Sequence, residues 1–486
     1  MNSFKSLSFI SDINFKKVFR IIIIIIFIII YFSYNITIKL YRNHLNELYS
    51  NIQSDININF NNNINNKIRI AIYTISLKDG GLQRFTSNFI NNLDKVKLFK
   101  FYLFTQKEKE ENEYKILDNV KRIFIKNDSD INDVIKHIKK NKIDIFIYQF
   151  PRKKDIYALN NLKSIYNLNK VKVIFYIHSS FFYWFYSTYY SSLDIYKEYT
   201  KSKYVISLIP LENDYLFKKW RINSILFDNF MTYDYNSIIQ SNLSDNKILL
   251  IGRGKNKLKR FNLGIQAIEY IKNEISEIKL FIISSTNNTE FLKNYIDNLN
   301  LGFNIFFSNY TSDPSIYFRT PRLNYLTSIS ESYALTLAET KVYGIPTIIL
   351  GLNYVSMSKK GTIIIYDDYP ETLAKISINI LKNKKYNKKL SEQARKSMKI
   401  FTNEKIIDKW KKLLFLVYND YTNYTKYFDR SVYNEKELSE ILKIQINLMK
   451  KRMTNMENIN TTFIENLNNI RISKYLNKDD NILKYE

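Results

Sequence analysis

The sequence predicts two α/β domains in tandem, each built around a doubly wound parallel sheet. From residue 68 onward, short apolar runs of strand length alternate with longer segments of helical period, a pattern typical of parallel strands joined by helices. About six such runs fall in each half of the chain. The length of 486 residues exceeds one compact domain and is enough for two domains with extensions.

The apolar runs give the expected strands in order along the chain. Ligands of open α/β sheets bind outside the carboxyl ends of the strands, so residues that carry chemistry should follow these runs closely. The first half contains the runs Ile68–Ile75, Leu98–Phe104, Arg122–Ile125, Ile143–Tyr148, Val171–Ile177 and Tyr204–Ile209. The second half contains Ile248–Ile251, Lys279–Ile283, Asn304–Phe307, Tyr325–Ile329, Thr347–Leu350 and Thr362–Tyr366.

A membrane-spanning helix is expected ahead of the first domain. Ile21–Ile38 is an uncharged run of 18 residues, close to the ~20 that a bilayer core requires, and its insertion should gain about 5 kcal/mol. A cleavable signal peptide is the main alternative, but its apolar region is shorter and ends in small residues, whereas Tyr31 and Phe32 stand here. Four cations precede the run and two follow it, so the amino terminus is expected in the cytosol and the domains in the lumen or outside the cell. Domains on the cytosolic face are the alternative.

The chain is accordingly expected to have six parts. Apolar residues between 438 and 463 recur at a 4,3 spacing, which fits a short coiled coil for self-association and equally fits packing on the chain's own domains. The parts are a cytosolic tail at 1–20, a transmembrane helix at 21–38, an Asn-rich stem at 39–66, a first domain at 67–235, a second domain at 236–418 and a charged helical tail at 419–486.

The strong positive charge does not by itself indicate a nucleic-acid partner. The formal net charge is +27, but the lysines are scattered along helices and loops and form no cluster interleaved with stacking aromatics. We therefore interpret the charge as compositional drift and expect no nucleic-acid binding. The chain has no cysteine, which excludes disulfides, thiolate chemistry and Cys-ligated metals.

Two features at strand ends of the first domain could contact a ligand. Gly80 and Gly81 follow the first strand and precede a helix, where glycines let the backbone approach a phosphate or sugar and the helix N-terminus supplies N–H donors. An ordinary tight turn would also use this pair. His178 directly follows the fifth run, which places an imidazole at the cleft, although a lone histidine is more often structural.

The second domain carries cations and carboxylates at equivalent places. Arg253 and Lys259 flank the loop after its first strand and could converge on a pyrophosphate, although a solvated basic loop is the alternative. Glu331 is expected at the end of a strand, and Glu339 lies on the next, mostly apolar helix. Carboxylates accept hydrogen bonds from vicinal hydroxyls, so two of them near one strand end suit a sugar and a ribose.

Together these residues resemble the retaining nucleotide-sugar glycosyltransferases of family 4, which have two Rossmann-like domains in the GT-B fold. The resemblance covers residues 67–416 and depends above all on Glu331-x7-Glu339 followed by Gly344-x-Pro346, with support from Gly80-Gly81 and Arg84. It implies that Arg253 and Lys259 hold the donor diphosphate, Glu331 the donor sugar and Glu339 the ribose. It also implies that Gly81 packs by the phosphates, that His178 faces the donor sugar, and that a last helix containing Trp410 returns to the first domain.

The sequence departs from that family at two places. Gln83 stands where the family usually has Glu, and Ser284-Ser285 replaces the usual glycines after a strand, which affects the expected fit of the nucleotide base. The resemblance implies no metal or other cofactor, because the basic pair neutralises the leaving group. Asp128 and Asp130 form an Asp-x-Asp pair, but in a polar loop that we interpret as coincidental.

The resulting prediction is a membrane-anchored transferase that moves a sugar from a nucleotide donor to a glycan or lipid-linked acceptor. Its expected catalytic residues are His178 and Glu331, and its donor-binding residues are Gly80, Gly81, Arg253, Lys259, Glu331 and Glu339. A sugar-nucleotide epimerase or phosphorylase on the same fold, and an inactive membrane-bound sugar-binding protein, remain alternatives. The sequence does not indicate which sugar or acceptor is used.

Overall fold

The computed structural model describes residues 67–454 except 79, 126–130, 150–164, 166–167, 169, 181–198, 201, 219, 253–256, 285–289, 310, 312, 422–423 and 429–432. All described residues belong to one compact unit, Lys67–Glu486. The expected transmembrane helix and stem, the Asp128/Asp130 pair, Arg253 and the tail beyond 454 lie outside the described residues. Within the described part of the chain, no helix is long and apolar enough to cross a membrane.

The first domain is built on a parallel sheet whose described strands follow the order β3-β2-β1-β4-β5-β6-β7. The order reverses beside β1, so β1 lies at the centre with β2 and β4 as its neighbours. The carboxyl ends of β1 and β5 therefore open at the same edge of the sheet. The strands are β1 Ile68–Thr74, β2 Phe99–Thr105, β3 Lys121–Phe124, β4 Ile145–Tyr148, β5 Lys172–Ile177, β6 Tyr204–Ser207 and β7 Ser224–Leu226.

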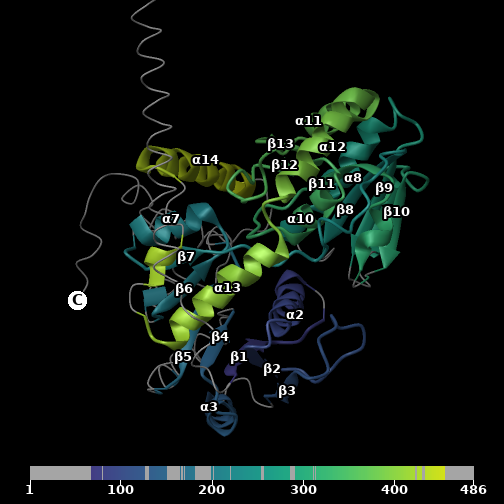
Figure 1. The fold of residues 1–486 in the computed structure, drawn as a ribbon. Helices are drawn as coiled ribbons and strands as arrows, with labels where there is room; N and C mark the ends of the chain where they lie inside the picture. The colour runs from purple at the N-terminus through teal and green to yellow at the C-terminus, as the bar shows by residue number, and fades with distance from the viewer. Residues whose placement is uncertain are drawn as a thin grey trace, which may run out of the picture. The chain divides into compact units, whose positions relative to one another are not determined.

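The second domain repeats this design with six described strands in the order β10-β9-β8-β11-β12-β13. Its first strand, β8, again lies beside the point where the order reverses, with β9 on one side and β11 on the other. The strands are β8 Asp245–Gly252, β9 Lys279–Ser284, β10 Ile305–Asn309, β11 Pro321–Leu326, β12 Thr347–Leu350 and β13 Thr362–Ile365. The expectation of two doubly wound parallel sheets is confirmed (Figure 1).

Two details of the expected strands need correction. The first sheet has an additional strand, β7, whose three residues make too short an apolar run to be recognised. Tyr325–Ile329 is not a strand as a whole, because β11 begins at Pro321 and ends at Leu326. Beyond it the backbone turns toward the neighbouring loop, and Ile329 donates a hydrogen bond to Leu258 O at 2.8 Å. Glu331 therefore lies in a loop five residues past β11, not at a strand end.

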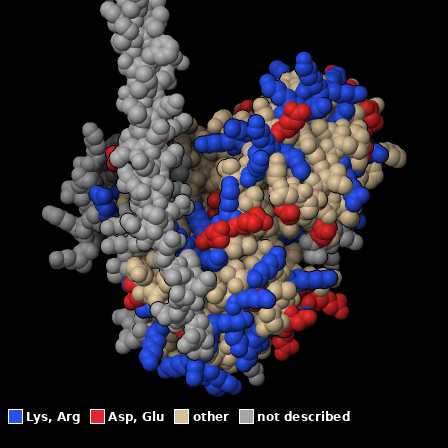
Figure 2. Space-filling view, in the orientation of Figure 1, with Lys and Arg blue, Asp and Glu red and all other residues tan. Residues whose placement is uncertain are grey.

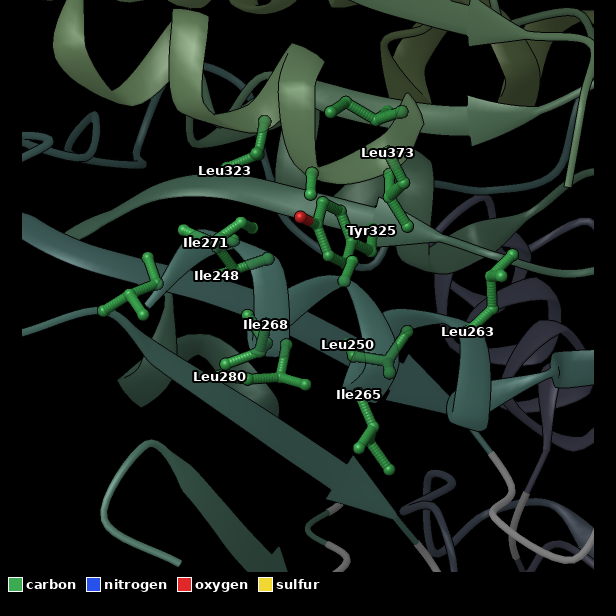
Figure 3. Packing of buried hydrophobic residues seen from close by; sticks show 14 of the residues in the cluster. Ile248, Leu250, Leu263, Ile265, Ile268, Ile271, Leu280, Leu323, Tyr325 and Leu373 are labelled. Atoms are coloured by element: carbon green, nitrogen blue, oxygen red, sulfur yellow. The ribbon is translucent and has the colours of Figure 1, made fainter. Parts of the chain in front are cut away.

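Helices cover both sheets and give each domain its own core. In the second domain, α8 and α11 pack on the β8, β9 and β11 face, where Leu250, Ile268 and Leu323 are fully buried (Figure 3). Each such side chain contributes about 1.5–3 kcal/mol by leaving water. The described helices are α2 Gly81–Asp94, α3 Ile131–Lys140, α7 Pro210–Lys218, α8 Phe261–Ile271, α9 Glu290–Asn298, α10 Leu335–Val342, α11 Pro370–Lys382, α12 Lys384–Met398, α13 Asn403–Tyr418 and α14 Glu435–Thr454, with 3₁₀ turns at Lys257–Lys259, Pro314–Tyr317 and Tyr424–Tyr427.

Helix α13 packs on the first domain although it follows the second domain in sequence (Figure 1). Its Trp410 is fully buried, with ring centroids 4.6 Å from Phe89, 4.7 Å from Phe227 and 5.6 Å from Tyr176. An indole in such a position buries a large area and makes favourable edge-to-face contacts. Trp410 is therefore part of the first domain's core.

Helix α14 packs against the chain itself. Leu442 and Ile446, two residues of the expected 4,3 pattern, are 5% and 8% exposed in the single chain. Of the two interpretations of that pattern, the structure thus shows packing on the chain's own domains for the described part of α14.

Lysine and arginine side chains are spread over the visible face of both domains, interspersed with neutral and acidic side chains (Figure 2). One group of them lies over the part of the second domain that carries α11 and α12, and another lies at the lower end of the first domain (Figure 2). The positive charge on this face is therefore distributed, in agreement with the scattered lysines of the sequence.

Candidate active site

The turn between β1 and α2 presents backbone to the space between the domains. Gly80 has φ of +129°, a conformation that L side chains rarely adopt, and Gly81 begins the helix. The N–H of Arg84 donates to Gly80 O at 3.0 Å, so the helix starts at this turn. Both glycines line the cavity between the domains.

His178 immediately follows β5 at the same edge of the sheet. Its ring centroid lies 4.6 Å from that of Phe85 and 4.2 Å from that of Tyr176, and its Nε2 atom has no hydrogen-bond partner among the described residues. Burial among these rings lowers the pKa of His178 to about 3. The imidazole is therefore neutral near pH 7 and can exchange hydrogen bonds with a hydroxyl group without acting as a cation.

Lys259 and Glu331 lie side by side in the second domain, where the ammonium and carboxylate form an ion pair. Lys259 ends the short 3₁₀ turn after β8, and Thr327 Oγ1 donates to its carbonyl oxygen at 2.6 Å. The N–H of Glu331 donates to the Tyr354 hydroxyl at 3.2 Å. An ammonium has three donors, so Lys259 retains capacity for an anionic ligand beside the carboxylate.

Glu339 forms a buried ion pair across the two domains. It lies on α10, and its Oε1 accepts hydrogen bonds from Arg84 on α2 and, at 2.7 Å, from the hydroxyl of Thr232. The side chains of Arg84 and Glu339 are 9% and 1% exposed. The second carboxylate oxygen of Glu339, Oε2, is buried and has no partner among the described residues. The carboxylate is thus held by one oxygen and has an acceptor left over.

A cavity of about 520 Å³ brings these groups together between the domains. Its volume lies within the ~300–1,000 Å³ range of small-molecule sites. It gathers every sequence-predicted site residue that the structure describes, and only Arg253 lies outside the described residues. The residues that line it include Gly80, Gly81, Arg84, Tyr114, His178, Ser180, Asn229, Gly252, Lys259, Ile283, Thr311, Glu331, Ser332, Thr336 and Glu339.

Two contacts of this site were missed in the sequence. Arg84 and Glu339 are 255 residues apart, and Thr232 lies in the connection between the domains, so no local spacing relates them. The available signal was the position of Arg84 one turn into the helix after Gly80-Gly81.

Over the described ranges, with their gaps, no group of three or more His, Asp or Glu side chains could hold a metal ion.

The second domain is similar to a known protein family. Residues 234–397 match the family Glycosyl transferases group 1. This segment contains Lys259, Glu331 and Glu339, but neither the first domain nor α14. The chain is also 28% identical over 159 residues to poly(glycerol-phosphate) alpha-glucosyltransferase of Bacillus subtilis (strain 168), across 32% of this chain and 23% of that protein. The group 1 match and this relative support a transferase enzyme.

Solved structures share the fold over both domains. Sucrose-phosphate synthase from Thermosynechococcus elongatus is similar with a TM-score of 0.60 at 13% identity, over 73% of this chain and all of that chain. The Anabaena protein HepE, solved in complex with UDP and glucose, is similar with a TM-score of 0.57 at 11% identity, over 72% of this chain and 99% of that chain. At these identities the similarity shows the fold alone, two Rossmann-like domains that are consistent with the GT-B arrangement.

Proposed function

We propose that this chain is a membrane-anchored, metal-independent glycosyltransferase that uses a nucleoside-diphosphate sugar and retains the anomeric configuration. The observation that carries the proposal is the cavity in which Lys259, Glu331, Glu339 and His178 meet beside the Gly80-Gly81 turn. The group 1 match of the second domain and the transferase similar to part of the chain support this choice. A glycan or a lipid-linked alcohol is the proposed acceptor.

Each charged group of the cavity has a proposed role. Lys259, together with Arg253, neutralises the diphosphate, because charge-assisted hydrogen bonds stabilise phosphate oxygens strongly. Glu331 accepts from hydroxyls of the donor sugar, and Oε2 of Glu339 accepts from the ribose while Oε1 stays with Arg84. Neutral His178 contacts the donor sugar near the acceptor, where a cation would be costly to bury.

The proposed reaction exchanges one glycosidic bond for another. The acceptor hydroxyl oxygen forms a bond to the anomeric carbon on the face from which the diphosphate leaves. The bond from that carbon to the phosphate oxygen breaks, and its electron pair leaves with the diphosphate. The acceptor proton passes to the departing phosphate oxygen. Electrostatic stabilisation of the diphosphate by Lys259 lowers the barrier without a metal ion.

Donor hydrolysis and transfer, measured with a panel of nucleotide sugars in the presence of EDTA, test this proposal. We expect turnover of at least one donor, unchanged in chelator, because the basic residues neutralise the leaving group. Turnover that disappears in EDTA and returns with manganese would overturn the metal-independent mechanism. Asp128 and Asp130 would then be the candidate metal ligands. An epimerase would convert the sugar while it remains on the nucleotide, and a phosphorylase would require inorganic phosphate. Binding without turnover would identify a sugar-binding protein.

Anchoring by residues 21–38 is the remaining part of the proposal. The uncharged run and the excess of cations before it support an anchor with the amino terminus in the cytosol. In sealed microsomes, a tag at the carboxyl terminus should resist added protease until detergent is present. Digestion of the tag without detergent would place the catalytic domains in the cytosol, and release of the protein by carbonate would exclude the anchor.

A further inference from the structure

Helix α14 lies beyond the segment that matches the group 1 family, and its amino-terminal end is fixed to the first domain. The N–H of Tyr433, just before the helix, donates to Asp214 Oδ2 on α7 at 2.8 Å, and Lys218 of α7 donates to the Tyr433 carbonyl oxygen. Asp214 is fully buried and Lys218 is largely buried. A contact with a buried carboxylate is costly to break, so this end of α14 is held in place.

The other end of α14 reaches the second domain through Arg452. This guanidinium is only 2% exposed, and its Nε donates to Asp368 Oδ2 at 3.0 Å. Its Nη2 donates to Leu350 O at 2.9 Å, and its Nη1 donates to Ile329 O at 3.4 Å. Gly351 makes this approach possible, because a Cβ there would lie 2.8 Å from Leu448 of α14.

Asp368 links Arg452 to the loop that carries Lys259. Arg260 also binds this carboxylate, with its Nη1 2.7 Å from Oδ2, and its Nε donates to Thr327 O at 3.0 Å. Burial alone would raise the pKa of Asp368, but the hydrogen bonds and charges of Arg260 and Arg452 bring that pKa below its usual value. One carboxylate therefore joins the two guanidiniums, and Arg260 directly follows Lys259.

A second route leads from α14 to Glu331. The Gln445 amide, 2% exposed, donates to Gly351 O and to Asn353 Oδ1, both at 2.6 Å. The next residue in that loop, Tyr354, accepts a hydrogen bond from the backbone N–H of Glu331. Because Arg452 also contacts the Ile329 carbonyl two residues before Glu331, the same helix fixes the Glu331 loop at two places.

We propose that Arg452 and Gln445 of α14 are positioning residues that hold Lys259 and Glu331 in the geometry that binds the donor. This inference rests on the proposed function only for the identity of the ligand; the fixing of the two loops is a property of the chain itself. The binding site thus depends on a helix outside the segment that matches the group 1 family, and none of the described residues of that helix lines the cavity.

Amide hydrogen exchange of the full chain tests the fixing of the loops directly. In Arg452→Ala, exchange in residues 257–260 and 327–331 should rise about tenfold or more, because both loops lose contacts that oppose local opening. Arg452→Lys, which keeps the charge but loses the forked geometry, should show a smaller rise in the same two loops. Lys443→Ala is the matched control, since Lys443 is an exposed cation of the same helix and should leave both loops unchanged.

UDP is the probe for the effect on binding. We expect Arg452→Ala to weaken UDP binding about tenfold, because small displacements of positioned groups are costly. In combination with Lys259→Ala the loss should be smaller than the product of the two single losses, since both act through the same ammonium. A loss equal to that product, or loop exchange equal to that of the wild type, would overturn the proposal.

If Arg452→Ala does not fold, hydrogen exchange and UDP binding of Arg452→Lys test the proposal in its place. If the wild type binds neither UDP nor other nucleotides, the proposed function fails and hydrogen exchange alone still decides on positioning.

Discussion

Replacing Arg84 with alanine is expected to lower the free energy of unfolding by about 3–5 kcal/mol, as for other buried ion pairs that lose one partner. The substitution leaves the Glu339 carboxylate buried with a hydrogen bond from Thr232 but without a compensating charge. Because the pair joins α2 to α10, the loss also removes a link across the cavity. Urea unfolding of the compact unit Lys67–Glu486, followed by circular dichroism, measures the effect.

Two variants make that prediction specific. Adding Glu339→Gln to Arg84→Ala should restore part of the stability, because a neutral amide is less costly to bury than an unpaired carboxylate. Lys382→Ala is the control, since Lys382 pairs with Glu274 at the surface, where both side chains are about half exposed and little change is expected. A single Arg84→Ala variant as stable as the wild type would show that the pair does not stabilise the fold.

The second large effect is expected on donor use. Lys259→Ala should lower kcat/KM for the nucleotide sugar about ten- to hundredfold, because a charge-assisted contact is worth roughly 1.5–3 kcal/mol. The loss should appear mainly in kcat, since the charge on the diphosphate develops as the glycosidic bond breaks. Initial rates at several donor concentrations separate the two parameters.

The control for that variant is Lys293→Ala, which removes an exposed cation from α9 in the same domain and should leave the kinetics unchanged. Glu331→Gln complements it, because it frees Lys259 from its ion pair and replaces the charged acceptor proposed for the sugar hydroxyls with a neutral amide. Unchanged kinetics in a folded Lys259→Ala variant would exclude the phosphate role. Equal losses in both lysine variants would indicate a general effect of charge.

Sequence reasoning predicted the two sheets because buried parallel strands are continuous apolar runs. It missed β7 because Ser224–Leu226 has only three residues, and it placed β11 too late because Pro321 and Arg322 interrupt the apolar pattern at the strand's start. The positions of His178 and Glu339 followed from their distance to a strand or helix end. The ion pair between Lys259 and Glu331 could not be predicted in this way, because the two residues are 72 positions apart in sequence. The neighbouring parallel strands β8 and β11 bring them together.

The tail is a second case in which the sequence predicts an element but not its packing partner. The 4,3 spacing of Leu442 and Ile446 predicted a helix, which α14 confirms. Which partner covers its apolar face depends on tertiary packing, and the structure provides the chain's own domains. The polar contacts of Arg452 and Gln445 left no periodic signal, because each depends on a loop more than 80 residues away in sequence.

Because Trp410 packs in the first domain, the core of that domain can be completed only late in synthesis of the chain. Its main aromatic partner on α2, Phe89, leaves the ribosome 321 residues earlier (410 minus 89), which corresponds to roughly 15–60 seconds at ordinary elongation rates. Throughout that interval the first domain lacks α13, which covers one of its apolar faces in the folded structure, while the second domain can already assemble most of its own core. A chaperone that binds nascent chains should therefore remain on the first domain until residue 418 has emerged, and translation pauses placed before α13 should prolong that association.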